Sequence, residues 1–159
     1  MKKVLLFLMA MFAFGLQNAN AQDAPLKIVT NHPDFKIKVK RCAASGKTVI
    51  IDLVLNNEGT NDITIGDVFA MGWSEAIDDE GNIYSDDIKV KVANRGSYSG
   101  NTGGFLLPTG VPMKLSIQIN NVPSSAENIA RLFLRVDCYA WGLGNDKKVK
   151  FNNIPISRE

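Results

Sequence analysis

Alternating apolar and polar residues predict that most of this chain forms β-strands. The pattern is clearest in TVIIDLVL, residues 48–55, where every odd position is apolar: Val49, Ile51, Leu53 and Leu55. A period of two places these side chains on one face of a strand, and β-branched residues suit a pleated surface. We expect residues 48–55 to form the central strand of the core.

The preceding segment, residues 35–40, alternates in the same way, with three apolar residues between Lys36, Lys38 and Lys40. If both strands direct their odd residues inward, a three-residue turn at 44–46 satisfies the register. That turn pairs Ala43 with Lys47 and places Lys38 opposite Asp52 on the outer surface. It also directs Cys42 outward.

Shorter extended segments follow. They are expected at residues 63–65, 68–71, 73–77, 83–84, 88–92, 113–119 and 132–138, and the parity change at Asn152-Asn153 predicts a bulge in the last strand. Residues 94–104 are predicted to be a loop, and Ser124 with Glu127 fits the capping box of a single helical turn. These elements predict an all-β, two-sheet immunoglobulin-like sandwich of about seven to nine strands over residues 35–159.

The first 21 residues have the features of an export signal. Lys2-Lys3 precede an apolar run at residues 4–16, and Ala19-Asn20-Ala21 matches a cleavage site. We expect cleavage after Ala21, a leader segment at residues 22–34 and a periplasmic or secreted domain without membrane insertion. An uncleaved N-terminal anchor is the alternative.

Charge argues against a nucleic-acid partner. The chain has 18 Lys and Arg and 16 Asp and Glu, and removal of Lys2 and Lys3 leaves equal numbers of both. Nucleic-acid binding requires concentrated positive charge, which a neutral total does not suggest.

The two cysteines, Cys42 and Cys138, suggest a disulfide, because an exported chain is exposed to oxidising conditions. Alternation on residues 132–138 directs Cys138 to the core, whereas Cys42 is directed outward. A bond between them therefore requires a bulge or strand end that turns one side chain. Two unpaired thiols are the alternative.

Catalytic motifs are lacking in the sequence. The single histidine, His32, lies in the leader, so a Ser-His-Asp or Cys-His site in the domain is not expected, and neither is a cofactor. The one acidic cluster offers Asp78, Glu80 and Asp86 as weak candidates for calcium, although it lacks the glycine of an EF-hand loop. A solvated turn is the alternative.

Aromatic residues give the candidate binding surface. If even residues of the 132–138 strand face the core, Phe133, Tyr139 and Trp141 lie on the opposite face beside Arg135. Rigid aromatic side chains next to arginine favour recognition of a protein surface or a sugar. Tyr98, in the 94–104 loop, is a further candidate. Alternatively, another segment covers these residues.

Three segments resemble a known family: IDLVLNNEGTNDITI, AIDDEGNIYS and LLPTGVPMKLSIQINNVPSSAENIARLFLRV. They are similar to immunoglobulin-like domains of unknown function in bacterial exported proteins, including the family called immunoprotective extracellular proteins. The resemblance covers residues 35–136 and implies a non-catalytic exported module. The antibody pattern is absent, since Val136 stands where a tyrosine is expected.

The sequence thus predicts a non-catalytic exported domain that binds a protein or a glycan. One alternative is a structural subunit that joins an envelope assembly through an exposed sheet edge. Another is a calcium-dependent module or an enzyme at the acidic turn.

Overall fold

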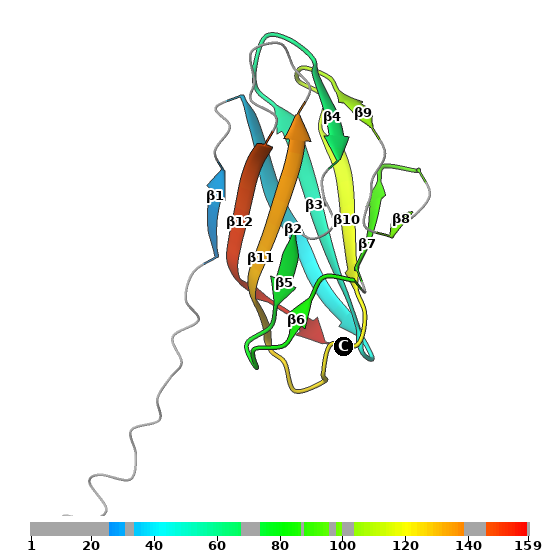
Figure 1. Cartoon of the computed structure of the whole chain (residues 1–159), viewed down its shortest axis with the longest axis vertical. Helices are drawn as coiled ribbons and strands as arrows, with labels where there is room; N and C mark the ends of the chain where they lie inside the picture. The colour runs from blue at the N-terminus through cyan, green and yellow to red at the C-terminus, as the bar shows by residue number, and fades with distance from the viewer. Residues whose placement is uncertain are drawn as a thin grey trace, which may run out of the picture.

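The computed structural model describes residues 26–30, 34–67, 74–86, 88–95, 98–99, 104–138 and 146–158. These residues form two β-sheets that pack against each other, which confirms the predicted all-β sandwich (Figure 1). Within these ranges the chain forms no helix, and so no helix long and apolar enough to span a membrane.

The seven-stranded sheet has the order β1-β12-β11-β4-β9, with β5 beside β11 and β6 beside β5. Its strands are β1 (Lys27–Thr30), β4 (Ile63–Asp67), β5 (Glu75–Ile77), β6 (Ile83–Tyr84), β9 (Phe105–Leu107), β11 (Asn128–Cys138) and β12 (Asp146–Pro155). Strand β1 lies in the segment predicted as a leader, so part of that segment belongs to the sheet.

The six-stranded sheet has the order β13-β2-β3-β10-β7-β8. Its strands are β2 (Phe35–Ser45), β3 (Thr48–Asn57), β7 (Ile88–Val92), β8 (Tyr98–Ser99), β10 (Met113–Ile119) and β13 (Ser157–Arg158). The described segments thus include more strands than the seven to nine expected, because several are only two to four residues long. One of these, β8, lies within the predicted 94–104 loop.

The apolar faces predicted from alternation meet between the sheets and form one core. In β3 the odd residues are buried and the intervening residues are partly exposed, as predicted. In β7 the apolar residues Ile88, Val90 and Val92 are buried and the lysines between them are exposed, again as the alternation predicts. Strand β11 contributes its even positions from 132 to 136. Hydrophobic burial on this scale is the main favourable term in folding.

The turn between β2 and β3 differs from the prediction. It contains two residues, Gly46 and Lys47, and pairs Ser45 with Thr48. Gly46 has φ +57°, which glycine adopts readily and which the first position of a type II′ hairpin turn requires. The predicted three-residue turn at 44–46 is therefore wrong, because this tighter turn matches the twist of the paired strands.

A bulge in β2 compensates for the shorter turn. The pairing with β3 shifts at Lys40, so that Arg41 rather than Lys38 lies opposite Asp52. Lys38 instead lies opposite Val54. The extra residue in β2 restores the register between the bulge and the start of β2. In that part, the odd-numbered residues of both strands face the core.

In the last long strand, β12, the buried positions change from odd-numbered to even-numbered residues, as predicted. The adjacent strand, β11, shows a change of the same kind. In β12, Phe151 and Ile154 are both buried, and in the adjacent β11, Ile129 and Leu132 are both buried. Asn153, which lies between the two β12 residues, has φ +56°, a conformation that asparagine tolerates. The pairing of β11 with β12 keeps one register on both sides. The distortion is thus a paired kink, with no inserted residue.

The predicted helical turn near Ser124 does not form. A β-turn replaces it, in which the backbone N–H of Ala126 donates to the carbonyl of Pro123 at 3.2 Å. The backbone N–H of Glu127 donates to the carboxylate of Asp79 at 3.1 Å, so the capping box is not made. The acidic turn after β5 therefore fixes the start of β11.

Arg158 closes this end of the sandwich. Its guanidinium donates to the carbonyls of Pro123 and Ala126, each at 2.8 Å, and to the carbonyl of Gly46 at 3.3 Å. The planar guanidinium suits several acceptors at once. The contacts join β13 to the β2–β3 turn and to the segment that precedes β11.

Candidate functional surfaces

The structure brings together two residues of the predicted aromatic surface. Phe133 and Arg135 both lie on the outward side of β11 and are half-buried. The ammonium of Lys150, on β12, lies 5.7 Å from the centroid of the Phe133 ring, within the range of a cation–π contact. Tyr139 and Trp141 lie outside the described residues. Tyr98 lies in β8, but its side chain is not among those described.

The acidic turn is organised around Asp78, which is only 1% exposed. Its Oδ1 accepts the backbone N–H groups of Glu80 and Asn82, at 3.0 and 2.8 Å. Its Oδ2 accepts the Asn82 amide at 2.9 Å and the Tyr84 hydroxyl at 2.7 Å. Both carboxylate oxygens are thus engaged within the protein.

This arrangement shifts two pKa values. Burial acts to raise the pKa of Asp78, but hydrogen bonds from Asn82, Tyr84 and Glu80 outweigh it, and the pKa lies below its usual value. Burial, followed by the hydrogen bond to Asp78, raises the pKa of Tyr84 above its usual range. Asp78 is therefore ionised and serves as a structural anchor of the turn.

The calcium candidates do not form a cluster. Glu80 and Asp86 are exposed, and Asp78 is occupied by its four donors. In the described part of the chain, no three His, Cys, Asp or Glu side chains are placed to hold a metal ion.

Cys42 is a buried, free thiol, not an outward one. The bulge at Lys40 reverses the alternation of β2, and Cys42 turns into the core opposite Ile51. The predicted outward orientation of Cys42 is wrong because the sequence does not reveal the inserted residue.

The predicted disulfide between Cys42 and Cys138 does not fit the fold. Cys42 lies near the end of β2 that Arg158 joins to the start of β11. Cys138 is the last residue of β11, whose 11 residues extend about 33 Å at about 3.3 Å per residue. The two cysteines therefore lie toward different ends of the sandwich, whereas a disulfide requires Cα atoms about 4.4–6.8 Å apart.

We expect Cys42 to be unreactive in the folded protein. Burial raises its pKa to about 12, despite the nearby positive charge of Arg158, so little of the reactive thiolate forms at pH 8. In a Cys138→Ser variant, a thiol reagent should label Cys42 only after denaturant is added. Rapid labelling of the native variant would show that Cys42 is exposed.

A second candidate surface lies on the outward side of the six-stranded sheet. Exposed cations alternate with buried apolar residues along β2 and β7, and Lys114 takes the equivalent outward position on β10. We call this surface the lysine face and define it by Lys36, Lys38, Lys40, Arg41, Lys89, Lys91 and Lys114.

The register brings these cations together from separate parts of the chain. One row across the sheet contains Arg41, Asp52, Ser116 and Lys91. In the next row, Lys38 and Lys114 lie on either side of Val54. Since neighbouring strands are about 4.8 Å apart, Lys38 and Lys114 are separated by about 10 Å at the backbone.

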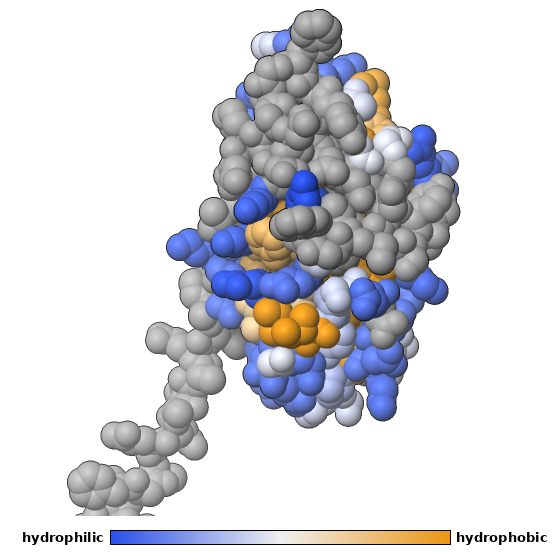
Figure 2. Space-filling model, viewed as in Figure 1, coloured by the Kyte–Doolittle hydropathy of each residue, from blue (hydrophilic) through white to orange (hydrophobic). Residues whose placement is uncertain are grey.

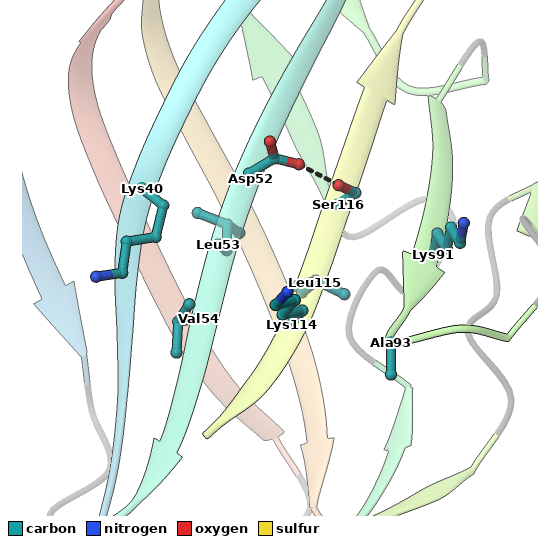
Figure 3. A pocket seen from close by; sticks show the side chains of 9 residues that line it. All are labelled: Lys40, Asp52, Leu53, Val54, Lys91, Ala93, Lys114, Leu115 and Ser116. Atoms are coloured by element: carbon teal, nitrogen blue, oxygen red, sulfur yellow. Dashed lines mark hydrogen bonds between the residues drawn. The ribbon is translucent and has the colours of Figure 1, made fainter. Parts of the chain in front are cut away.

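A shallow concavity of about 310 Å³ occupies the centre of the lysine face. Lys40, Lys91 and Lys114 line it, together with Asp52, Ser116 and Ala93. Figure 3 shows Lys114 between Lys40 on β2 and Lys91 on β7, with the Lys40 ammonium directed away from β3. The small side chain of Ala93, opposite Lys114 in the turn after β7, leaves this side open.

Asp52 balances only part of this charge. Its Oδ2 accepts a hydrogen bond from Arg41 Nε at 3.1 Å, and its Oδ1 accepts one from the hydroxyl of Ser116. Glu58 pairs with Lys36. The other five lysines of the lysine face have no ion-pair partner within the described ranges. The lysine face therefore carries an excess of positive charge.

Sequence reasoning missed the lysine face for two reasons. The equal numbers of acidic and basic residues in the predicted mature chain concealed their separate locations. The alternating lysines of residues 36–40 and 89–91 were visible, but only the pairing of β10 with both β3 and β7 shows that they share one sheet.

Comparisons with known proteins do not identify a family. No family model matches the chain, and no curated protein matches its sequence. A structural search finds a family 123 glycoside hydrolase from Clostridium perfringens, whose structural analysis concerned glycolipid glycan hydrolysis. It is 13% identical, with a TM-score of 0.40, over 86% of this chain and 27% of that protein. This chain thus spans less than a third of that protein.

Proposed function

We propose that this protein is an exported, non-catalytic module that binds an acidic polysaccharide through the lysine face. The observation that carries the proposal is the group of lysines without ion-pair partners around the central concavity. Lysine is a flexible point charge, which suits a ligand whose anionic groups recur along its length. The predicted signal sequence at residues 1–21 supports export.

The composition of the lysine face favours a glycan over a protein partner. Its other outward residues include several hydroxyl and amide side chains: Thr48, Asn56, Ser116 and Gln118. Among the described outward residues of β2, β3, β7 and β10, none is aromatic. Protein interfaces typically contain an apolar centre with aromatic anchors, and single-stranded nucleic acids stack on aromatic rings. Sugar hydroxyl groups match the polar side chains present here.

The same surface supports binding without catalysis. Glycoside hydrolysis typically uses two carboxyl groups, one on each side of the scissile bond. Among the described residues, Asp52 is the only carboxylate that lines the concavity, and Arg41 and Ser116 already occupy its oxygens. This arrangement favours a role in holding the ligand.

The exposed edge of β2 also favours a binding module over the alternative function, a subunit that joins an assembly by accepting a strand from a partner. Strand β13 pairs only with Ala43 and Ala44 on the outer side of β2. The rest of that side carries three alternating lysines and the bulge at Lys40. Charged side chains and bulges are features by which proteins discourage edge-to-edge pairing.

Neutralising the concavity should weaken binding of an acidic polymer. We expect the triple variant Lys40→Gln, Lys91→Gln, Lys114→Gln to bind dextran sulfate roughly tenfold more weakly at low salt, if each exposed ion pair contributes about 0.5 kcal/mol. Binding by wild type should weaken as salt is added, because salt screens exposed charges. Affinity is measured by isothermal titration calorimetry.

The matched control retains the charge. A triple variant with arginine at the same three positions should bind dextran sulfate about as well as wild type, and uncharged dextran should bind to neither protein. Equal affinity of the glutamine variant and wild type for dextran sulfate would contradict the proposal. So would a wild-type protein that binds neither dextran sulfate nor polygalacturonate.

A further inference from the structure

The opposite sheet carries a second group of outward cations. Arg131 on β11 and Lys148 and Lys150 on β12 are exposed, and Lys27 on β1 is exposed in the same row as Arg131. Arg135 lies opposite Lys148 and is half-buried. We call this surface the Phe133 face and define it by Phe133, Lys27, Arg131, Arg135, Lys148 and Lys150.

The Phe133 face combines charge with apolar surface. The Phe133 ring lies beneath the Lys150 ammonium, and Ile83 on β6, at 66% exposure, lies opposite Ile77 on β5. Figure 2 shows the hydrophobic surface over β5 and β6 beside hydrophilic residues. The Phe133 ring is half-buried, so the cations around it provide most of the accessible contacts, and these suit a sugar that bears anionic substituents.

Acidic residues are largely excluded from both faces. Among the side chains that the structure describes, the exposed acids all lie in turns and loops: Glu58, Asp62, Asp79, Glu80, Asp86 and Glu127. On the Phe133 face, Glu75 lies opposite Phe133 and is half-buried. At the next outward position of β11 after Arg135, the register pairs Asp137 with Asp67 and Asp146.

The two faces point in opposite directions, because each is the outer side of one sheet of the sandwich. A short ligand on one face does not reach the other. We propose that the protein is bivalent, with the lysine face and the Phe133 face each binding one acidic polysaccharide chain, so that one molecule cross-links two chains. This inference rests on the proposed function of the lysine face.

Stoichiometry tests the inference. A sulfated oligosaccharide too short to reach from one face to the other is titrated into the mature protein by calorimetry. Wild type should bind two molecules, and a variant with Arg131→Gln, Lys148→Gln and Lys150→Gln should bind one. The glutamine variant of the lysine face should also bind one, at the remaining face.

Cross-linking gives a second readout. Wild type mixed with long dextran sulfate chains should scatter light most strongly at an intermediate ratio of protein to polymer, because multivalent linkage requires both faces. Each single-face variant should bind the polymer without this maximum. Arginine in place of Lys148 and Lys150 should retain cross-linking, because it preserves the charge.

The outcomes separate the two proposals. Suppose that wild type binds one oligosaccharide per molecule and that only the lysine-face variant loses this binding. This result would support the proposed function and overturn bivalency. Two bound molecules in the Phe133-face variant would also overturn it. Absence of binding by wild type would contradict the proposed function itself.

Discussion

Replacement of Asp78 by alanine is expected to lower the free energy of unfolding by about 4 kcal/mol. Hydrogen bonds to a charged group contribute roughly 1.5–3 kcal/mol each, but contributions within one network are not additive, so the loss is smaller than their sum. The carboxylate accepts four hydrogen bonds at 1% exposure, and its loss leaves the Tyr84 hydroxyl and two backbone N–H groups without their acceptor. Urea denaturation at pH 7 measures the change.

Asp86→Ala is the matched control, since it removes an exposed carboxylate eight residues further along the chain. We expect this variant to remain within about 0.5 kcal/mol of wild type, as is usual for exposed positions. Tyr84→Phe, which removes one of the four donors, should cost about 1–2 kcal/mol. If Asp78→Ala proved no more destabilising than Asp86→Ala, Asp78 would not anchor the turn.

The same residue predicts a pH dependence. The pKa of Asp78 is lower in the folded protein than in the unfolded chain, so its contribution to stability is complete above the unfolded value of about 3.9 and is lost as the pH falls through the folded value. The difference in stability between wild type and Asp78→Asn should therefore shrink below about pH 4. Urea titrations at pH 7 and pH 3 test this.

Asn57→Asp is expected to destabilise the protein by about 3 kcal/mol, because it replaces a buried donor with a carboxylate oxygen that faces backbone carbonyls. The Asn57 amide is 2% exposed and donates to the carbonyls of Asn61 and Leu107, at 2.8 and 3.1 Å. Its oxygen accepts the N–H of Gly59 at 3.0 Å. One side chain thus holds the loop after β3 against β9.

The adjacent residue provides the control. Asn56→Asp makes the same substitution on the outward face of β3, where the side chain is partly exposed. Its effect should remain below about 1 kcal/mol, as for most surface substitutions. Equal losses from both variants, measured by urea denaturation, would show that the added negative charge and not the buried amide causes the effect.

Much of the fold follows from local pattern. The strands β3, β7 and β10 have the predicted inward faces because each buries one side against the opposite sheet. The β2–β3 register was mispredicted because alternation is satisfied equally by a longer turn or by a tight turn with a bulge. The orientation of Cys42 depended on that choice.

The candidate sites were less predictable because they depend on contacts between distant segments. The outward position of Phe133 follows from alternation alone, whereas its contact with Lys150 requires the β11–β12 register. Asp78 resembled a solvated acid in the sequence because nothing in the local pattern shows that Tyr84 and Asn82 fold back onto it. A short Asp-turn-Tyr segment bounded by strands was the available signal.

The pairing of β1 with β12 has a consequence for biogenesis. These strands come from opposite ends of the described chain, and β11, near the centre of the seven-stranded sheet, pairs with β12 along most of its length. Such pairings close very large loops and tend to form slowly. The sandwich therefore cannot be completed until residues 146–158 have emerged. For the export that we propose, this order of completion leaves the chain without its finished core, and so able to pass through a translocation channel, until its last strands have been made.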